Sequence, residues 1–203
     1  MNRILALAPH PDYVEIGCGG TLAVYAERGA EVHLFVATEG GKGGDVEIRR
    51  AEQEAAAEIL GIKSVHWGGF EDSELPSERA LIRAIEDAVA EARPVIVLVN
   101  HHQDTHQDHR ALARAAHSAT RYVPNVLAYE TPTSCNFEPT VFMDIAVMLG
   151  QKTEALRAHA SQVEKTNIQG LNIVDIALAT AHFRGLQGRL NSAEGFVPIR
   201  IQL

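Results

Sequence analysis

The sequence predicts an α/β protein of the Rossmann-like type, with a mostly parallel sheet and helices on both faces. Short apolar runs rich in β-branched residues alternate with longer segments of helical periodicity through the first two thirds of the chain. This strand-helix order implies right-handed crossovers between parallel strands, which give a doubly wound sheet. With 203 residues and 46% hydrophobic content, the chain can bury one substantial core. We therefore expect a single domain over residues 1–203.

Five buried parallel strands are expected in the first two thirds of the chain, at residues 4–9, 32–38, 64–67, 95–100 and 126–130. Four helices are expected to alternate with them, at residues 19–29, 46–61, 77–92 and 109–121. Gly61 is expected to end the second helix and Ser77 to cap the third. From about residue 131 the pattern weakens, and it predicts a loop and short strand over 131–145 and a helix over 151–165. A helix, a loop and a terminal strand are expected in the rest of the chain, which includes 184–203.

The composition argues against several classes of protein. The chain has 26 acidic and 18 basic residues, a net charge of -8, so no nucleic-acid partner is expected. No apolar run approaches the roughly 18 residues of a membrane span, and the first residues lack the pattern of a signal peptide. We therefore expect a cytoplasmic protein without a membrane partner. Cys18 and Cys135 have no spacing typical of a disulfide framework or a zinc site, and are expected to be reduced.

Polar residues follow every expected strand. In an open α/β sheet, ligands bind beyond the carboxyl ends of the strands, at the point where the strand order reverses. HPDYVE follows the first strand and HHQDTHQDH the fourth, and this second stretch holds four of the ten histidines of the chain within nine residues. A solvated loop that opens a helix is the simpler interpretation, but imidazoles gain nothing from crowding at a positive helix end.

A metal site explains the histidines better. If His106 and His109 lie in the first turn of a helix, their spacing places them on one face, where both can point into the same cleft. His10 adds a third imidazole from another strand end. Neutral imidazole is the commonest metal ligand, and catalytic zinc sites that use two histidines commonly add a carboxylate.

Two glycine-rich stretches suggest a competing function. GCGGTLA follows the first strand and EGGKGG the second, and either can bring backbone amides to a phosphate. Neither matches a dinucleotide-binding fingerprint or a Walker loop. Tight turns and close helix-strand packing are the more common reason for such glycines.

Three motifs carry a family resemblance: APHPDYVEIGCGGTLA at 8–23, IRRAEQEAAAEILG at 48–61 and DTHQDHRALARA at 104–115. With them, the sequence resembles the PIG-L/LmbE-like family of zinc-dependent N-acetylglucosaminyl deacetylases. Weaker matches follow in KTEALRAHASQ at 152–162 and SAEGF at 192–196. The resemblance implies an N-deacetylase that uses Zn²⁺, or another divalent metal, to remove the acetyl group from a small N-acetyl sugar and release acetate. We also expect a homo-oligomer.

The family motifs imply roles for individual residues. His10 and His109 are implied as metal ligands, and Asp12 as the general base. The family has a second aspartate after Asp12, which completes the metal site, and Tyr13 occupies that position in this chain. Tyr13 is therefore the expected third ligand, although its side chain is several ångströms longer than that of aspartate.

The third motif and the arginine of the second supply the remaining roles. His106 is implied as the group that stabilises the tetrahedral oxyanion, with Asp108 as its orienting partner. Arg49 corresponds to an arginine that helps to hold the sugar. Gln107 replaces a proline of the family and should matter little.

Tyr13 leaves three interpretations open. A tyrosine binds zinc as phenolate if the metal lowers its pKa from about 10. Alternatively, Asp104 or Glu15 supplies the missing oxygen. In the third interpretation the protein holds metal poorly and is a catalytically impaired or silent relative that binds a sugar. Three further acidic residues at strand ends can contact sugar hydroxyls or simply face solvent, namely Glu39, Asp72 and Glu130.

Overall fold

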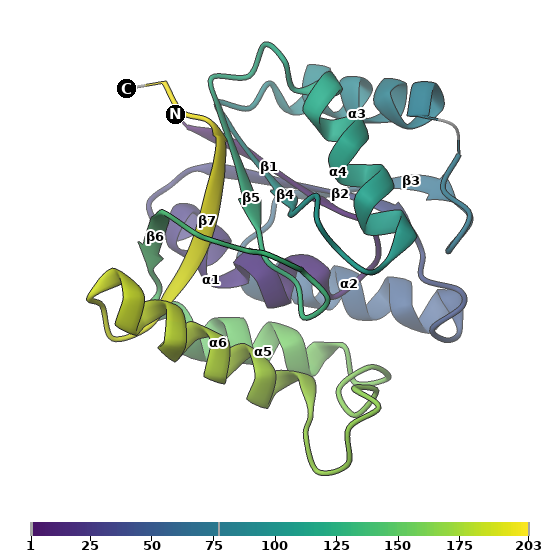
Figure 1. Ribbon diagram of the computed structural model, residues 1–203. Helices are drawn as coiled ribbons and strands as arrows, with labels where there is room; N and C mark the ends of the chain where they lie inside the picture. The colour runs from purple at the N-terminus through teal and green to yellow at the C-terminus, as the bar shows by residue number, and fades with distance from the viewer. Residues whose placement is uncertain (1, 77, 203) are drawn as a thin grey trace.

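A computed structural model describes residues 2–76 and 78–202, and shows one seven-stranded sheet in the order β3-β2-β1-β4-β5-β7-β6 (Figure 1). The strands are β1 (Arg3–Ala8), β2 (Glu31–Thr38), β3 (Ser64–Phe70), β4 (Ile96–Asn100), β5 (Asn125–Tyr129), β6 (Val141–Asp144) and β7 (Ala193–Arg200). The helices are α1 (Tyr13–Glu27), α2 (Val46–Leu60), α3 (Glu78–Ala92), α4 (Gln107–Ala119), α5 (Leu149–Ala158) and α6 (Ile173–Gly188), with a short 3-10 turn at Ala146–Met148. Strands β1 to β5 are parallel, whereas β7 is antiparallel to both β5 and β6.

Strand β1 is buried on both of its faces. Side chains alternate across a strand, so Ile4 and Ala6 face one layer while Leu5 and Leu7 face the other. The first layer contains residues of α1, α2 and α5, and the second contains residues of α3 and α4. The predicted α/β class, with a parallel core and helices on both faces, is confirmed.

The strand order reverses between β1 and β4. The chain passes from β1 to β2 on one side and from β4 to β5 on the other, while β1 and β4 pair with each other. Their carboxyl ends therefore release two loops into the same crevice, residues 9–12 and 101–106.

Helix α1 begins six residues before the predicted start. The glycine-rich stretch lies inside the helix, where a Cβ on Gly17 would stand 2.1 Å from the Tyr129 ring and one on Gly20 would stand 2.9 Å from Ile145. These glycines permit close packing of α1, the more common of the two interpretations.

Of the other predicted boundaries, one agrees, one differs and one lies outside the described residues. Gly61 ends α2 in the left-handed conformation, as predicted. The helix predicted over 151–165 instead spans Leu149–Ala158. Ser77, the predicted cap of α3, lies outside the described residues. No helix within the described residues is long and apolar enough to cross a bilayer.

Candidate active site

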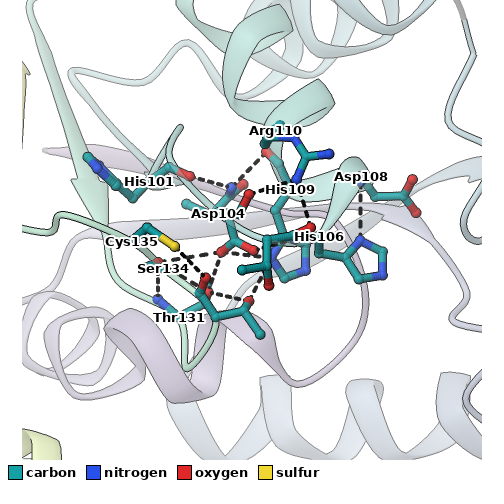
Figure 2. Close-up of polar contacts among 12 residues, drawn as sticks. His101, Asp104, His106, Asp108, His109, Arg110, Thr131, Ser134 and Cys135 are labelled. Carbon is teal, nitrogen blue, oxygen red and sulfur yellow. Dashed lines mark hydrogen bonds and ion pairs between the residues drawn. The ribbon is translucent and has the colours of Figure 1, made fainter.

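His106 and His109 come together at the start of α4. His106 is the N-cap, and its Nδ1 accepts a hydrogen bond from the backbone N–H of Asp108 at 3.2 Å. His109 lies one turn further, so that the two rings stack with centroids 4.6 Å apart. Figure 2 shows both rings side by side above the loop from β5. The shared face predicted from their spacing is therefore observed.

His10 lies between two carboxylates. Its Nε2 is 2.9 Å from Oδ2 of Asp108 and 3.1 Å from Oδ1 of Asp72, and all three side chains are buried. Burial opposes protonation of His10, but the hydrogen bonds to Asp108 and Asp72 outweigh it and raise its pKa above the ordinary value. Asp108 is further fixed by the backbone N–H of Ser73, at 2.8 Å.

His109 presents one free nitrogen. Its Nδ1 lies 3.0 Å from Oδ2 of Asp104, and both side chains are fully buried. Burial lowers the pKa of His109 below its ordinary value, so the ring is neutral and its proton faces Asp104. Its Nε2 has no hydrogen-bond partner among the described residues. A carboxylate that orients an imidazole while leaving the other nitrogen free is the arrangement of a metal-binding histidine.

Tyr13 is the first residue of α1 and packs against two histidines. The centroid of its ring lies 4.5 Å from that of His109 and 5.4 Å from that of His10. Burial, followed by the charges of Asp12 and Asp104, raises the pKa of the Tyr13 phenol above its ordinary value. The side chain is therefore a neutral phenol beside the histidine cluster.

Asp12 is held from two directions. Its backbone N–H donates to Oε1 of Gln53 at 3.2 Å, and its Oδ2 accepts from Nη2 of Arg49 at 3.2 Å. Arg49 also donates to the carbonyl oxygens of Pro11 and Gly40, and is itself buried. Burial raises the pKa of Asp12 above its ordinary value. Arg49, predicted to hold the sugar, thus lines the cavity and also binds the protein through both of its terminal nitrogens, while its Nε has no partner among the described residues.

Three potential metal donors converge within 4.8 Å of one another, one atom each from His10, His106 and Asp108. Two imidazoles and a carboxylate form a donor set that catalytic zinc commonly uses, and the free Nε2 of His109 adds a further imidazole nearby. The residues present therefore fit a divalent metal ion.

The carboxylate beside these imidazoles belongs to Asp108, a residue expected only to orient His106. Its link to His106 runs through the backbone N–H rather than through the carboxylate. Of the two substitutes considered for the missing oxygen, Asp104 is bonded to His109, and Glu15 accepts from Gln53 behind the site.

The site opens into a cavity of 560 Å³. Its polar lining includes His10, Asp12, Arg49, Asp72 and His106, and one wall is apolar, with Ile16, Ile168, Ile173 and Ile176. Asp72, predicted as a possible sugar contact, does line this cavity. The other two acidic candidates form ion pairs elsewhere, Glu39 with Arg50 and Glu130 with Arg184.

The comparisons with known proteins agree on one family. Residues 5–120 match the family model described as PIG-L, GlcNAc-PI de-N-acetylase. The uncharacterized deacetylase YaiS of Escherichia coli is 35% identical over 167 residues, which is 78% of this chain and 90% of that protein. The diacetylchitobiose deacetylase of Thermococcus kodakarensis is 32% identical over 188 residues, covering 80% of this chain and 70% of that protein.

Solved structures extend the likeness over the whole chain. The conserved protein TT1542 from Thermus thermophilus superposes with a TM-score of 0.88 at 29% identity, covering 100% of this chain and 97% of the other. The 4-carboxy-2-hydroxymuconate hydratase of Pseudomonas putida has a TM-score of 0.86 at 23% identity, covering 100% and 98% of the two chains. The likeness to the hydratase shows the fold alone, and a fold does not fix a reaction.

Proposed function

This chain belongs to the PIG-L family and is an N-deacetylase, and from that premise we propose that it removes the N-acetyl group from an N-acetylglucosamine-containing small molecule in a zinc-dependent hydrolysis that releases acetate. The gathering of imidazoles and a carboxylate beside Asp12 carries the proposal: one atom each of His10, His106 and Asp108 lie within 4.8 Å of one another, and the ring of His109 lies 5.4 Å from that of His10. The name of the diacetylchitobiose deacetylase supports the sugar class. A cytoplasmic location and a homo-oligomer remain predictions from the sequence.

We assign the metal to His10, Asp108 and one imidazole of α4. The Nδ1 of His106 accepts a hydrogen bond from the backbone N–H of Asp108, so the proton of its neutral ring is on Nε2. Neither nitrogen of His106 then has a free lone pair for a metal ion. His109 has the opposite tautomer, with a free Nε2. His10, Asp108 and His109 would therefore hold the ion, and Asp108 would supply the oxygen expected from Tyr13. When bound, zinc polarises the acyl oxygen and makes its water more acidic.

Asp12 is the proposed general base. Its carboxylate takes a proton from the water whose oxygen attacks the amide carbon. The same proton then goes to the sugar nitrogen as the carbon–nitrogen bond breaks. The raised pKa of buried Asp12 suits this exchange, because a base works best when its pKa is near the working pH.

His106 is the proposed donor to the oxyanion. Burial lowers the pKa of His106 below its ordinary value, so its ring is neutral with the proton on Nε2. His106 lines the cavity, where the tetrahedral oxygen would develop. Removing one such donor commonly costs about a hundred- to a thousandfold in rate.

Acetate release by the zinc-loaded protein tests this function, with N,N'-diacetylchitobiose as the first substrate. Asp12→Asn keeps the shape of the side chain but removes the base, so kcat should fall by about 10² to 10⁴-fold at unchanged zinc content. Asp87→Asn makes the same change on an exposed face of α3 and should leave kcat unaltered. Full activity of Asp12→Asn would refute the mechanism.

A further inference from the structure

The backbone of Asp12 lies in a conformation that is uncommon outside glycine. Asp12 has φ 77° and ψ -19°, in the left-handed region that residues with a Cβ rarely adopt. Such a conformation persists only when the surrounding structure holds it. Asp12 is the residue just before α1, so its backbone conformation also sets the direction in which its carboxylate points.

Gln53 of α2 binds the backbone N–H of Asp12, while the Asp12 carbonyl accepts from the N–H of Ile16 at 3.1 Å, within the first turn of α1. The Oε1 of Gln53 accepts the N–H of Asp12 at 3.2 Å, and its Nε2 donates to Oε1 of Glu15 at 2.6 Å. Glu15 can only accept, so the amide of Gln53 has one orientation, with its oxygen toward Asp12. Gln53 is fully buried.

The carboxylate of Glu15 also forms an ion pair with His159. Its Oε2 lies 3.7 Å from Nε2 of His159, an ion-pair distance that is too long for a hydrogen bond. Glu15 and His159 are both fully buried. Contacts from His159, which follows α5, through Glu15 of α1 and Gln53 of α2 therefore end on the backbone of Asp12.

We propose that Gln53 is a positioning residue, which holds Asp12 in the left-handed conformation and so aims its carboxylate at the reacting water. This inference rests on the proposed function, in which Asp12 is the base. Without the acceptor at residue 53, the backbone of Asp12 relaxes toward negative φ and the carboxylate leaves its place beside Arg49. A displacement of about 1 Å at a catalytic group can cost about a hundredfold in rate.

The test compares Gln53→Met in two backgrounds. Methionine has a similar length and a good helix propensity, but it cannot accept the N–H of Asp12. Gln53→Met should lower kcat about a hundredfold, with KM within about twofold and unchanged zinc content. In an Asp12→Asn background the same change should cost nothing further, because there is no base left to aim. Gln187→Met, an exposed change in α6, is the matched control.

A merely structural role gives a different pattern. Gln53→Met would then lower kcat equally in both backgrounds, or would leave kcat within about threefold of wild type, and either result overturns the proposal. If Gln53→Met does not fold, the exchange Gln53→Glu with Glu15→Gln replaces it, because it keeps one carboxylate, one amide and an acceptor for Asp12. This pair should retain kcat within about tenfold, and a hundredfold loss in a folded, zinc-loaded pair overturns the proposal.

Failure of the proposed function would be recognised separately, because wild-type protein would then release no acetate. In that case the crystal structure of Gln53→Met decides the positioning role. Asp12 with a negative φ supports the proposal, and Asp12 still at positive φ beside Arg49 overturns it.

Discussion

The Nε2 atom of His10 lies 2.9 Å from Oδ2 of Asp108, although 98 positions separate the two residues in the sequence. The contact joins the loop after β1 to the first turn of α4, at the point where the strand order reverses. It places a carboxylate next to the imidazole that the first motif contributes. Asp108 can therefore provide the oxygen ligand that was expected from Tyr13.

Zinc affinity should depend on Asp108 and not on the Tyr13 hydroxyl. Tyr13→Phe removes only the phenol oxygen, so the zinc affinity measured by competition with a chelator should stay within about twofold of wild type. Asp108→Asn should weaken it by more than the roughly 10- to 100-fold typical of losing a residue that only supports a ligand. Weakened zinc affinity in Tyr13→Phe, with unchanged affinity in Asp108→Asn, would identify Tyr13 as the ligand instead.

The two histidines of α4 should separate into a metal ligand and a donor. His109→Gln removes the free Nε2 and should release zinc, whereas His106→Gln should keep zinc and lose activity about a hundred- to a thousandfold. Zinc analysis and acetate release on the same samples measure both effects. Zinc loss in His106→Gln with retention in His109→Gln would favour the His10, His106 and Asp108 set instead.

Glu194 should be important for stability. Its buried carboxylate accepts from the backbone N–H groups of Gly20 and Thr21, and forms an ion pair with buried Lys152. Glu194→Gln leaves the Lys152 cation without a counter-charge, which should lower the free energy of unfolding by about 3–5 kcal/mol in urea titrations. Glu154→Gln, on an exposed part of α5, should change it little, and equal effects of the two variants would contradict this role.

The buried pair of Glu15 and His159 should contribute to stability in a limited pH window. Burial opposes charge on both, but their attraction raises the pKa of His159 and lowers that of Glu15. The contribution from His159 is full below its unfolded pKa, near 6.5, and is lost as pH rises through the raised value. That from Glu15 is full above its unfolded pKa, near 4.3, and is lost as pH falls through the lowered value.

His159→Gln should therefore destabilise the protein more at pH 6 than at pH 9. Urea titrations of wild type and variant at both pH values measure the difference. His117→Gln, at an exposed position of α4, should show no such dependence. A destabilisation that is constant or larger at pH 9 would mean that the pair is not charged in the folded protein.

Local sequence patterns predicted most of the fold. The five parallel strands were predictable because each is a short apolar run with β-branched residues, and both faces of β1 are indeed buried. The start of α1 was not predictable, because glycines such as Gly17 and Gly20 favour a turn in the local sequence. Here they lie within the helix, where Tyr129 and Ile145 pack closely against them. The helix predicted over 151–165 ends at Ala158. Beyond it, the backbone N–H and the hydroxyl of Ser161 donate to the carboxylate of Glu52 in α2, a tertiary contact that the local pattern does not reveal.

The site was predictable where it depends on spacing and unpredictable where it depends on tertiary contacts. The pairing of His106 with His109 follows from helical periodicity, and His10 from its place at a strand end. The position of Asp72 beside His10 and the contact of Gln53 with Asp12 arise only when distant loops meet. Gln53 is one polar residue on the buried face of an ordinary helix, and no local signal distinguishes it.

Zinc dependence of acetate release tests the metal-assisted deacetylation most directly. Protein stripped with a chelator is titrated with zinc, while bound zinc and acetate released from N,N'-diacetylchitobiose are measured on the same samples. We predict that both rise together and level off at about one zinc per chain. Full acetate release from stripped protein would contradict the zinc requirement, and a zinc-loaded protein that releases no acetate from this or other N-acetylglucosamine compounds would contradict the deacetylation.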